Sequence, residues 1–186
     1  TFPKSNSTIA VILETGNLVL KERPDSSSPI WQSFDHPTDT WVPGAWVGMN
    51  KITGEYQILT SWKNSEDPAP GLFSHGIDQG GSSDYFILWN RSVVYDHLGL
   101  WNGHSTRFFL PMRSSWYLEM TFVETKEWQY FNGTPSNDSL LFRVVMDVSG
   151  QVKFFLWQED EQSWMLILSR PEVQCDVFSV CGAFGI

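Results

Sequence analysis

The chain has 186 residues, 41% of them hydrophobic and 18% charged, which is enough for one large or two small domains with a packed core. No apolar run reaches the roughly 18 residues that a membrane-spanning helix needs, so we expect a soluble globular segment without a membrane span. The formal net charge of −9 argues against nucleic acid and anionic membrane surfaces as partners, because both would repel the protein at long range.

Strands joined by tight turns are predicted along the first half of the chain. Thirteen Phe, ten Trp and five Tyr residues favour strands over helical bundles. Residues 9–13 are an apolar run, residues 15–17 a Thr-Gly-Asn turn and residues 18–20 a second apolar run, which predicts a hairpin. Proline and glycine predict loops at residues 66–71 and 78–84.

The second half of the chain continues this pattern. Residues 116–123, WYLEMTFV, alternate with the period of two that is typical of a half-buried strand. Residues 142–157 form a second hairpin around a Ser-Gly turn, and residues 163–168 supply a further strand. Residues 13–20 and 146–156 both combine an acidic residue, a turn glycine and an apolar strand, which suggests a duplicated β unit. We therefore expect an all-β protein with two related domains.

The segment WQSFDHPTDT, residues 31–40, contains the side-chain types of a hydrolase or a metal site. Ser33, His36 and Asp39 lie three residues apart around a proline, whereas a nucleophile, its base and the orienting carboxylate normally come from distant segments. A lone histidine also falls short of the ligand set of a metal site. Short polar side chains that bond nearby backbone groups favour a strand over residues 30–34 that runs into a capped turn.

Other candidate sites fail for similar reasons. Glu159, Asp160 and Glu161 are consecutive in a predicted hairpin loop, where adjacent carboxylates point apart into solvent rather than flank a glycosidic bond. The glycines of residues 78–84 lack the lysine and the helix of a phosphate-binding loop. The spacing of the three further histidines does not suggest metal ligands: His75, His97 and His104. We predict no catalytic site, no metal site and no cofactor.

Four Asn-x-Ser/Thr triplets predict N-glycosylation, at Asn6, Asn90, Asn132 and Asn137. Roughly one or two such triplets would be expected by chance, so a single triplet carries little weight. Four of them together with the cysteines near the end of the chain favour the secretory pathway. Pro135 follows the Asn132 triplet and restricts the turn that a glycan acceptor needs.

Both cysteines, Cys175 and Cys181, lie within eleven residues of the last residue. They could pair with each other and close a small loop. A cysteine cluster at this place instead favours the start of a disulfide-rich module whose partner cysteines lie outside this chain. The chain also has neither an initiating Met nor a secretory h-region, so we expect it to be a segment of a longer protein.

Seven segments occur along the chain in this order: TGNLVL, WQSFDHPTDT, GEYQILTSWKNSEDPAPGLFS, YFILWN, GLWNG, VVMDVSGQV and QCDVFSVCGAFG. Together they resemble the extracellular region of plant S-domain proteins, which are the S-locus glycoproteins and the G-type lectin S-receptor-like serine/threonine kinases. The resemblance runs over essentially the whole chain. It implies an all-β fold of tandem bulb-lectin-like domains of the β-prism type.

The same resemblance implies a domain order. Residues 1–45 would be the C-terminal part of a bulb-type lectin domain, residues 46–170 the S-locus glycoprotein domain, itself lectin-like, and residues 171–186 the start of a module like epidermal growth factor. In a full-length receptor, a PAN-type module, a membrane span and a cytoplasmic kinase would follow. The chain itself is then expected to be extracellular, attached to a membrane only through a span outside it.

Bulb-type lectins bind mannose through a strand motif, Gln-x-Asp-x-Asn-x-Val-x-Tyr, and the resemblance places residues 13–21 there. Asn17 and Val19 match the motif, whereas leucine, threonine and lysine replace its Gln, Asp and Tyr. Each missing neutral hydrogen bond costs about 0.5 to 1.5 kcal/mol. We therefore expect no strong mannose binding at this strand and interpret Asn17 and Val19 as turn and core residues.

Two functions remain. The first is an ectodomain that recognises a secreted peptide or a partner ectodomain, a second copy included, in pollen recognition, self-incompatibility or related signalling. The acidic charge would attract a basic partner, although it can also serve solubility alone. The second is a carbohydrate-binding module for cell-wall or microbial glycans, in which Trp101 or Trp116 stacks on sugars. Most of the ten tryptophans are expected in the core.

Overall fold

The computed structural model describes residues 8–23, 26–78, 80, 82–103, 117–178 and 180. Within these ranges the chain forms strands and two short 3₁₀ turns, at Ser33–Asp35 and Gln174–Asp176, and contains no α-helix. The prediction of an all-β protein is therefore confirmed.

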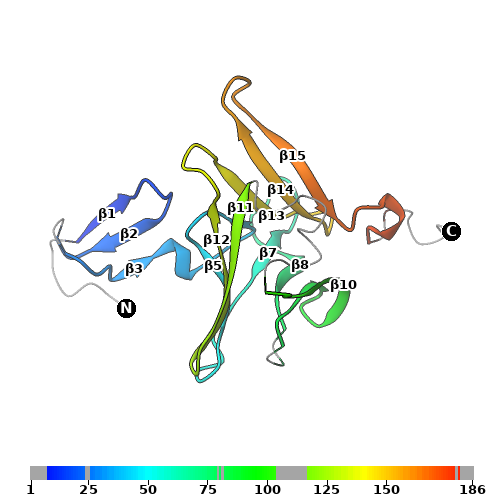
Figure 1. Ribbon diagram of the computed structural model, residues 1–186, viewed down its shortest axis with the longest axis horizontal. Coiled ribbons are helices and arrows are strands. Elements are labelled where there is room, and N and C mark those ends of the chain that lie inside the picture. The colour runs from blue at the N-terminus through cyan, green and yellow to red at the C-terminus, as the bar shows by residue number, and fades with distance from the viewer. Residues whose placement is uncertain are drawn as a thin grey trace.

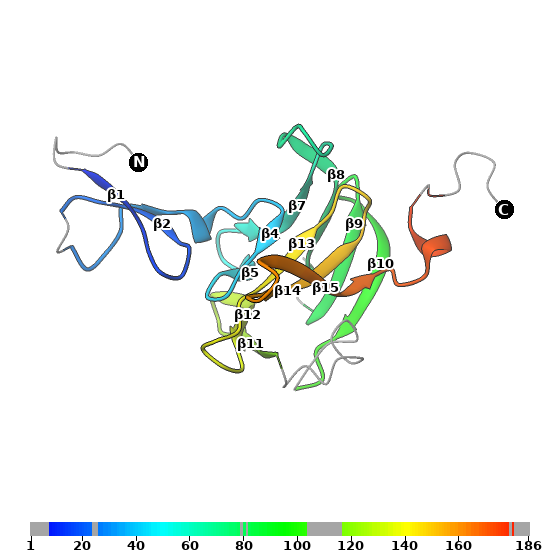
Figure 2. The same ribbon diagram turned by 90° about the horizontal axis from the view of Figure 1, so that it is seen from above.

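A small sheet forms the beginning of the described chain. Its three strands are β1 (Ile9–Ile12), β2 (Leu18–Lys21) and β3 (Trp31–Gln32). Strands β1 and β2 make the predicted hairpin, whose turn Gly16 closes at a positive φ of 83° that favours glycine. This sheet and the 3₁₀ turn Gln174–Asp176 lie on opposite sides of the main body (Figures 1 and 2).

The main body consists of three four-stranded antiparallel sheets. The first has the order β10-β9-β8-β7, with bounds Leu59–Trp62 for β7, Pro70–Ile77 for β8, Asp84–Trp89 for β9 and Val93–Leu100 for β10. The second has the order β11-β12-β5-β6, with bounds Trp46–Asn50 for β5, Tyr56–Gln57 for β6, Leu118–Glu124 for β11 and Trp128–Pro135 for β12. The third has the order β15-β14-β13-β4, with bounds Thr40–Trp41 for β4, Phe142–Met146 for β13, Val152–Gln158 for β14 and Ser163–Arg170 for β15.

One hydrophobic core joins the three sheets. Ile87 from the first sheet, Phe131 from the second and Phe154 from the third are all completely buried in it. Strands β13 and β14 contribute alternate residues, as a half-buried strand requires: along β14, Val152 and Leu156 point inward while Lys153 is half-buried on the outer face. Three sheets around one core are the β-prism arrangement expected from the sequence.

Two strand boundaries differ from the sequence predictions. Strand β3 ends at Gln32, two residues before the predicted end, because the next two residues both donate to the side-chain oxygen of Asn17 in the first hairpin. Strand β8 begins at Pro70, inside the predicted loop; proline is tolerated at the first position of a strand, where its missing N–H is not needed. Strand β4 lies before residue 46 but pairs with β13, so it belongs to the third sheet.

The expectation that most tryptophans form the core is wrong. Among the nine tryptophans that the structure describes, only Trp41 is fully buried, Trp62 is exposed and seven are half-buried. The outward-facing positions of a prism explain this result, because a large ring there covers the sheet while its edge remains in solvent.

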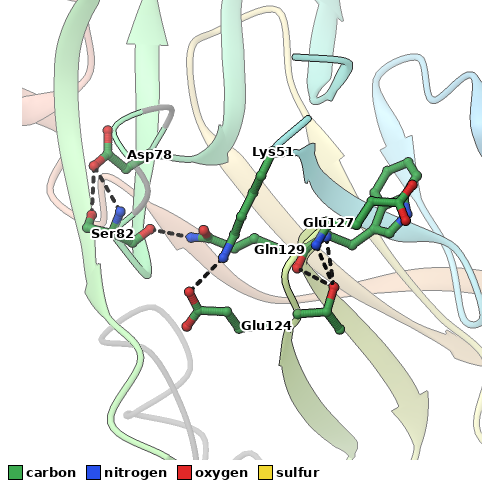
Figure 3. A network of polar contacts seen from close by, with 8 residues as sticks. Lys51, Asp78, Ser82, Glu124, Glu127 and Gln129 are labelled. Carbon is green, nitrogen blue, oxygen red and sulfur yellow. Dashed lines mark hydrogen bonds and ion pairs between the residues drawn. The ribbon is translucent and has the colours of Figure 1, made fainter. Parts of the chain in front are cut away.

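Polar side chains connect the hairpins at one place on the prism (Figure 3). The side-chain amide of Gln129 on β12 is completely buried and donates to the carbonyl oxygen of Ser82 at 2.7 Å. Lys51, in the turn between β5 and β6, forms an ion pair at 2.7 Å with Glu124 at the end of β11. The buried bond ties the β8–β9 connection of the first sheet to the second sheet, whereas the exposed ion pair contributes little to stability.

His75 is a buried ionisable side chain inside the first sheet. Its Nδ1–H donates to the backbone oxygen of Phe86 at 3.1 Å, and its ring packs against Tyr85 at a centroid distance of 4.3 Å. Burial lowers the pKa of His75 from 6.5 to about 4, although the bond to Phe86 acts in the opposite direction. The histidine therefore serves as a neutral core residue.

We predict that this histidine makes the fold sensitive to acid. In the unfolded chain His75 takes up a proton below its ordinary pKa of 6.5, while in the folded chain it stays neutral down to about 4. Stability should therefore fall by roughly 3 kcal/mol between pH 6.5 and 4 from this group. Denaturant unfolding at several pH values should show a shallower decline in His75→Gln. The exposed His36→Gln variant is the control, and an unchanged slope in His75→Gln would contradict the assignment.

Candidate functional site

The residues of WQSFDHPTDT serve separate structural roles. The hydroxyl of Ser33 donates to the side-chain oxygen of Asn17 at 3.1 Å, and the ring of His36 stacks on Trp31 at 5.3 Å. Asp39 accepts bonds from the hydroxyls of its two threonine neighbours. Each of the three candidate catalytic side chains therefore contacts a different partner, in the first sheet or in the segment that follows it.

Asn17 links the first hairpin to the segment that follows β3. Its amide nitrogen donates to Gln32 at 3.0 Å, and its amide oxygen accepts from the hydroxyl of Ser33 and from the backbone N–H of Phe34 at 3.3 Å. Asn17 and Val19 are both buried. Asn17 thus holds the hairpin against the 3₁₀ turn, and Val19 is a buried residue of β2 that pairs with Gln32 on β3.

The remaining candidate residues lie apart from one another. Glu159, Asp160 and Glu161 are exposed in the β14–β15 turn, where Glu159 accepts from the indole of Trp157 at 2.8 Å. His97 faces Asp84 at 3.4 Å. His104 and Trp116 lie outside the described residues, and Trp101 is half-buried against Phe131. Across the described ranges, no three His, Cys, Asp or Glu side chains converge as metal ligands would.

The glycan acceptors occupy different surroundings. Asn90 is exposed in the β9–β10 turn at a positive φ of 50°, and Asn137 is exposed in a turn where its side-chain oxygen accepts from the N–H of Ser139. Asn132 is half-buried in β12 between β11 and β5. Asn6 lies outside the described residues.

Of the two cysteines, Cys175 is exposed and carries no disulfide within the described part of the chain, and Cys181 lies outside it.

A cavity of about 500 Å³ opens between β10 and the segment that follows β15. It is lined by Tyr95, Asp96, His97, Leu98, Arg170, Pro171, Glu172, Val173 and Asp176. The two bulges of β10, between Val94 and Asp96 and between His97 and Gly99, change the direction of the strand beside this cavity. The cavity is large enough for one or two side chains of a partner.

The wall opposite β10 is a C-terminal strap, residues 171–178, anchored by aromatic packing. The ring of Phe178 stacks on Trp89 at 5.3 Å and meets Phe73 edge-on at 5.7 Å. The hydroxyl of Tyr95 donates to the carbonyl oxygen of Asp176 at 3.2 Å and accepts from the N–H of Phe178 at 2.8 Å. These contacts hold the strap against β9 and β10.

Acidic side chains outnumber the single arginine in the lining of the cavity. It contains the carboxyl groups of Asp96, Glu172 and Asp176, of which Glu172 pairs with Arg170 at 3.4 Å. Burial raises the pKa of Tyr95, and the charges of Asp96 and Asp176 act in the same direction, whereas the bond from Phe178 opposes them. Tyr95 therefore stays neutral at physiological pH and keeps its donor bond, while the carboxylates favour a positively charged group in the cavity.

Sequence reasoning missed this cavity. Tyr95 and Phe178 are 83 positions apart and belong to different elements, so no local pattern joins them. The available clue was an aromatic residue close to the cysteines, because a large ring in a polar segment commonly anchors that segment to a core.

Comparisons with known proteins identify the family. Residues 2–63 match the family model described as D-mannose binding lectin, and residues 97–186 match that of the S-locus glycoprotein domain. A G-type lectin S-receptor-like serine/threonine-protein kinase of Arabidopsis thaliana is 46% identical over 181 residues, 95% of this chain and 22% of the relative. Another kinase of this type from Arabidopsis thaliana is 38% identical over 95% of this chain and 20% of the relative. An S-locus-specific glycoprotein of Brassica oleracea var. alboglabra is 31% identical over 95% of this chain and 41% of the relative.

The chain belongs to the plant S-domain family. It spans about a fifth of the length of the kinase relatives and about two fifths of the glycoprotein. The S-domain chain corresponds to an extracellular segment of these relatives, and both matching models describe lectin or glycoprotein domains rather than a catalytic domain. In the part of the chain that the structure describes, no helix has the length and apolar character to cross a lipid bilayer.

We predict that Asn17 is needed to attach the first sheet of this S-domain chain. Asn17→Ala removes three side-chain hydrogen bonds from a buried position and should destabilise the chain by about 2 kcal/mol. Chemical denaturation followed by tryptophan fluorescence measures this loss. Asn64→Ala, which removes an exposed turn asparagine, is the control and should cost less. Equal losses in the two variants would show that Asn17 has no special role.

We also predict that the hydroxyl of Tyr95 holds the strap closed. Tyr95→Phe removes a donor bond to Asp176 and an acceptor bond from Phe178, so the amides of residues 174–178 should exchange with solvent roughly tenfold faster. Hydrogen exchange with mass spectrometry measures the change. Tyr130→Phe, on the outer face of β12, is the matched control. Unchanged exchange in the strap would mean that aromatic packing alone anchors it.

Proposed function

We propose that this chain is the recognition segment of an S-domain receptor-like kinase or S-locus glycoprotein, and that it binds a secreted basic peptide or a partner ectodomain. The observation that carries the proposal is the acidic cavity beneath the strap. Asp96, Glu172 and Asp176 line it, and Arg170 offsets only part of their charge. A lysine or arginine side chain has the length and charge to enter such a cavity from a partner surface.

The net charge of −9 supports the same proposal at longer range. A negative field raises the association rate of a basic partner, and this effect weakens with salt because charges are screened over about 8 Å at physiological ionic strength. Signalling by the whole protein in pollen recognition, self-incompatibility or a related response is part of the proposal. Any kinase activity would belong to the parent protein beyond this ectodomain segment.

The division of the chain is also proposed. Residues 1–45 would complete a bulb-type lectin domain, 46–170 would form the S-locus glycoprotein domain, and 171–186 would begin a module like epidermal growth factor. We further propose that Cys175 and Cys181 pair with cysteines outside this chain and that Asn6, Asn90, Asn132 and Asn137 accept glycans. Exposure supports Asn90 and Asn137 best.

A glycan-binding function is the second candidate, and one surface favours it. On the outer face of the second sheet, Trp46 lies 5.1 Å from Trp128 and 5.6 Å from Tyr130, and all three rings are half-buried. Partly exposed aromatic rings offer stacking surfaces for the apolar faces of sugars. A glycan array with wild-type ectodomain and Trp46→Ala tests this alternative.

We predict that capture with the complete glycosylated ectodomain recovers a basic secreted peptide. Its affinity, measured by calorimetry, should fall as salt rises and should drop about tenfold in Asp96→Asn with Asp176→Asn, because a charge-assisted contact contributes about 1.5 kcal/mol or more. Glu66→Gln is the control, since it removes one exposed charge outside the cavity. Recovery of glycans alone, or equal affinity in all variants, would refute the proposed role of the cavity.

A further inference from the structure

A second candidate surface lies on the outer face of the third sheet, at a place separate from the acidic cavity. Arg143 on β13, Phe155 on β14 and Leu166 on β15 stand in one cross-strand row. Trp157 and Trp164 form the next row, with ring centroids 5.4 Å apart. We call these five residues the arginine patch. Its side chains are half-buried or exposed, so it is an apolar surface with one cation at its centre.

The guanidinium of Arg143 is held between aromatic rings. Its carbon lies 4.3 Å from the ring centre of Trp164 and 5.2 Å from that of Phe155. The side chain therefore reaches from β13 across β14 to the outermost strand, where cation–π contacts fix its position. A guanidinium that is already fixed loses little entropy when it binds a planar anion through two parallel bonds.

Among the residues that the structure describes, this cation has no anionic partner at contact distance. None of the ion pairs among the described residues includes Arg143, and its Nε is buried without a hydrogen-bond partner. Asp39 acts on it only at longer range, and desolvation lowers the pKa of the guanidinium. Glu159, the acidic residue nearest in sequence to Trp157, accepts the bond from that indole instead.

The edge of the sheet beside the arginine patch is open. Strand β15 is last in the order of the third sheet, so within the described residues it has β14 on one side and no strand on the other. Figure 1 shows β15 at the outer margin of the molecule. Met165 and Leu166 remain 43% and 49% exposed along it. An edge strand with free backbone groups and exposed apolar side chains is a template for an added strand.

We propose that β15 and Arg143 together bind an extended acidic peptide segment of a partner protein. The segment would pair with the backbone of β15, cover Leu166 and Trp164, and place a carboxylate of a Glu or Asp on the guanidinium of Arg143. The negative charge of the chain as a whole does not prevent this contact, because charges beyond about 8 Å are screened at physiological salt. A carboxylate in direct contact with the guanidinium interacts more strongly than those distant charges.

A second copy of this chain fits the same surface poorly. Pairing two β15 strands by a twofold axis would bring two arginine patches together and leave both cations without an anion. Charge complementarity therefore favours an acidic partner over a homodimer through this edge.

The test uses the whole ectodomain and two synthetic peptides, each of eight residues that alternate Val and Thr, with either Glu or Gln at one central position. Calorimetry should show that the Glu peptide binds at least tenfold more tightly than the Gln peptide. Hydrogen exchange should show protection of residues 163–170 when the Glu peptide binds. Arg143→Met should abolish the preference for Glu while leaving thermal stability within a few degrees of wild type.

Lys153→Met is the matched control, because Lys153 lies on the same outer face but is already paired with Asp147 at 3.0 Å. It should keep the preference for the Glu peptide. Equal binding of the two peptides, no binding of either, or loss of the preference in Lys153→Met as well would overturn the proposal. Concentration-dependent dimers with crosslinks between β15 strands would overturn it too, in favour of a second copy. Neither variant changes a residue that lines the acidic cavity, so the proposed function of the cavity is tested independently of this proposal.

Discussion

The structure depends on closing three sheets around one aromatic core. Phe131 on β12 lies 4.9 Å from Tyr85 on β9 and 4.9 Å from Phe122 on β11, which joins the first and second sheets. The second and third sheets meet where Trp41 packs over Gly133: a Cβ atom at that glycine would stand 2.6 Å from the ring. Close packing of this kind leaves no room for a larger residue.

Closure around a single core determines what the outer faces can do. Because each strand presents alternate side chains inward, the outward ones are only partly covered. This is why Trp46, Trp157 and Trp164 are half-buried and why aromatic surfaces occur on two sheets. The cavity arises in a different way, from the bulges of β10 and the strap that Phe178 anchors. The surfaces proposed for recognition thus lie on sheet faces and beside the strap that follows β15.

Electrostatics divides these surfaces into two kinds. The acidic cavity has the charge of the chain as a whole and suits a cationic group, whereas the arginine patch presents one fixed cation within apolar surroundings. Long-range attraction and local contact can therefore select different partners, or two regions of one partner, on the same ectodomain segment.

The amino-acid sequence by itself determined the all-β class and the hairpins at residues 9–20 and 142–157, because hydrophobic period and turn residues are local properties. It also carried the resemblance to the S-domain family, through segments such as WQSFDHPTDT and VVMDVSGQV. It also indicated that Ser33, His36 and Asp39 are scaffold residues. Only the tertiary structure decided that Asn17 bonds the segment after β3, that Arg143 lies on Trp164, and that Tyr95 holds the strap. Such contacts join residues from 16 to 83 positions apart, and their partners are chosen by how the sheets pack and not by any local pattern.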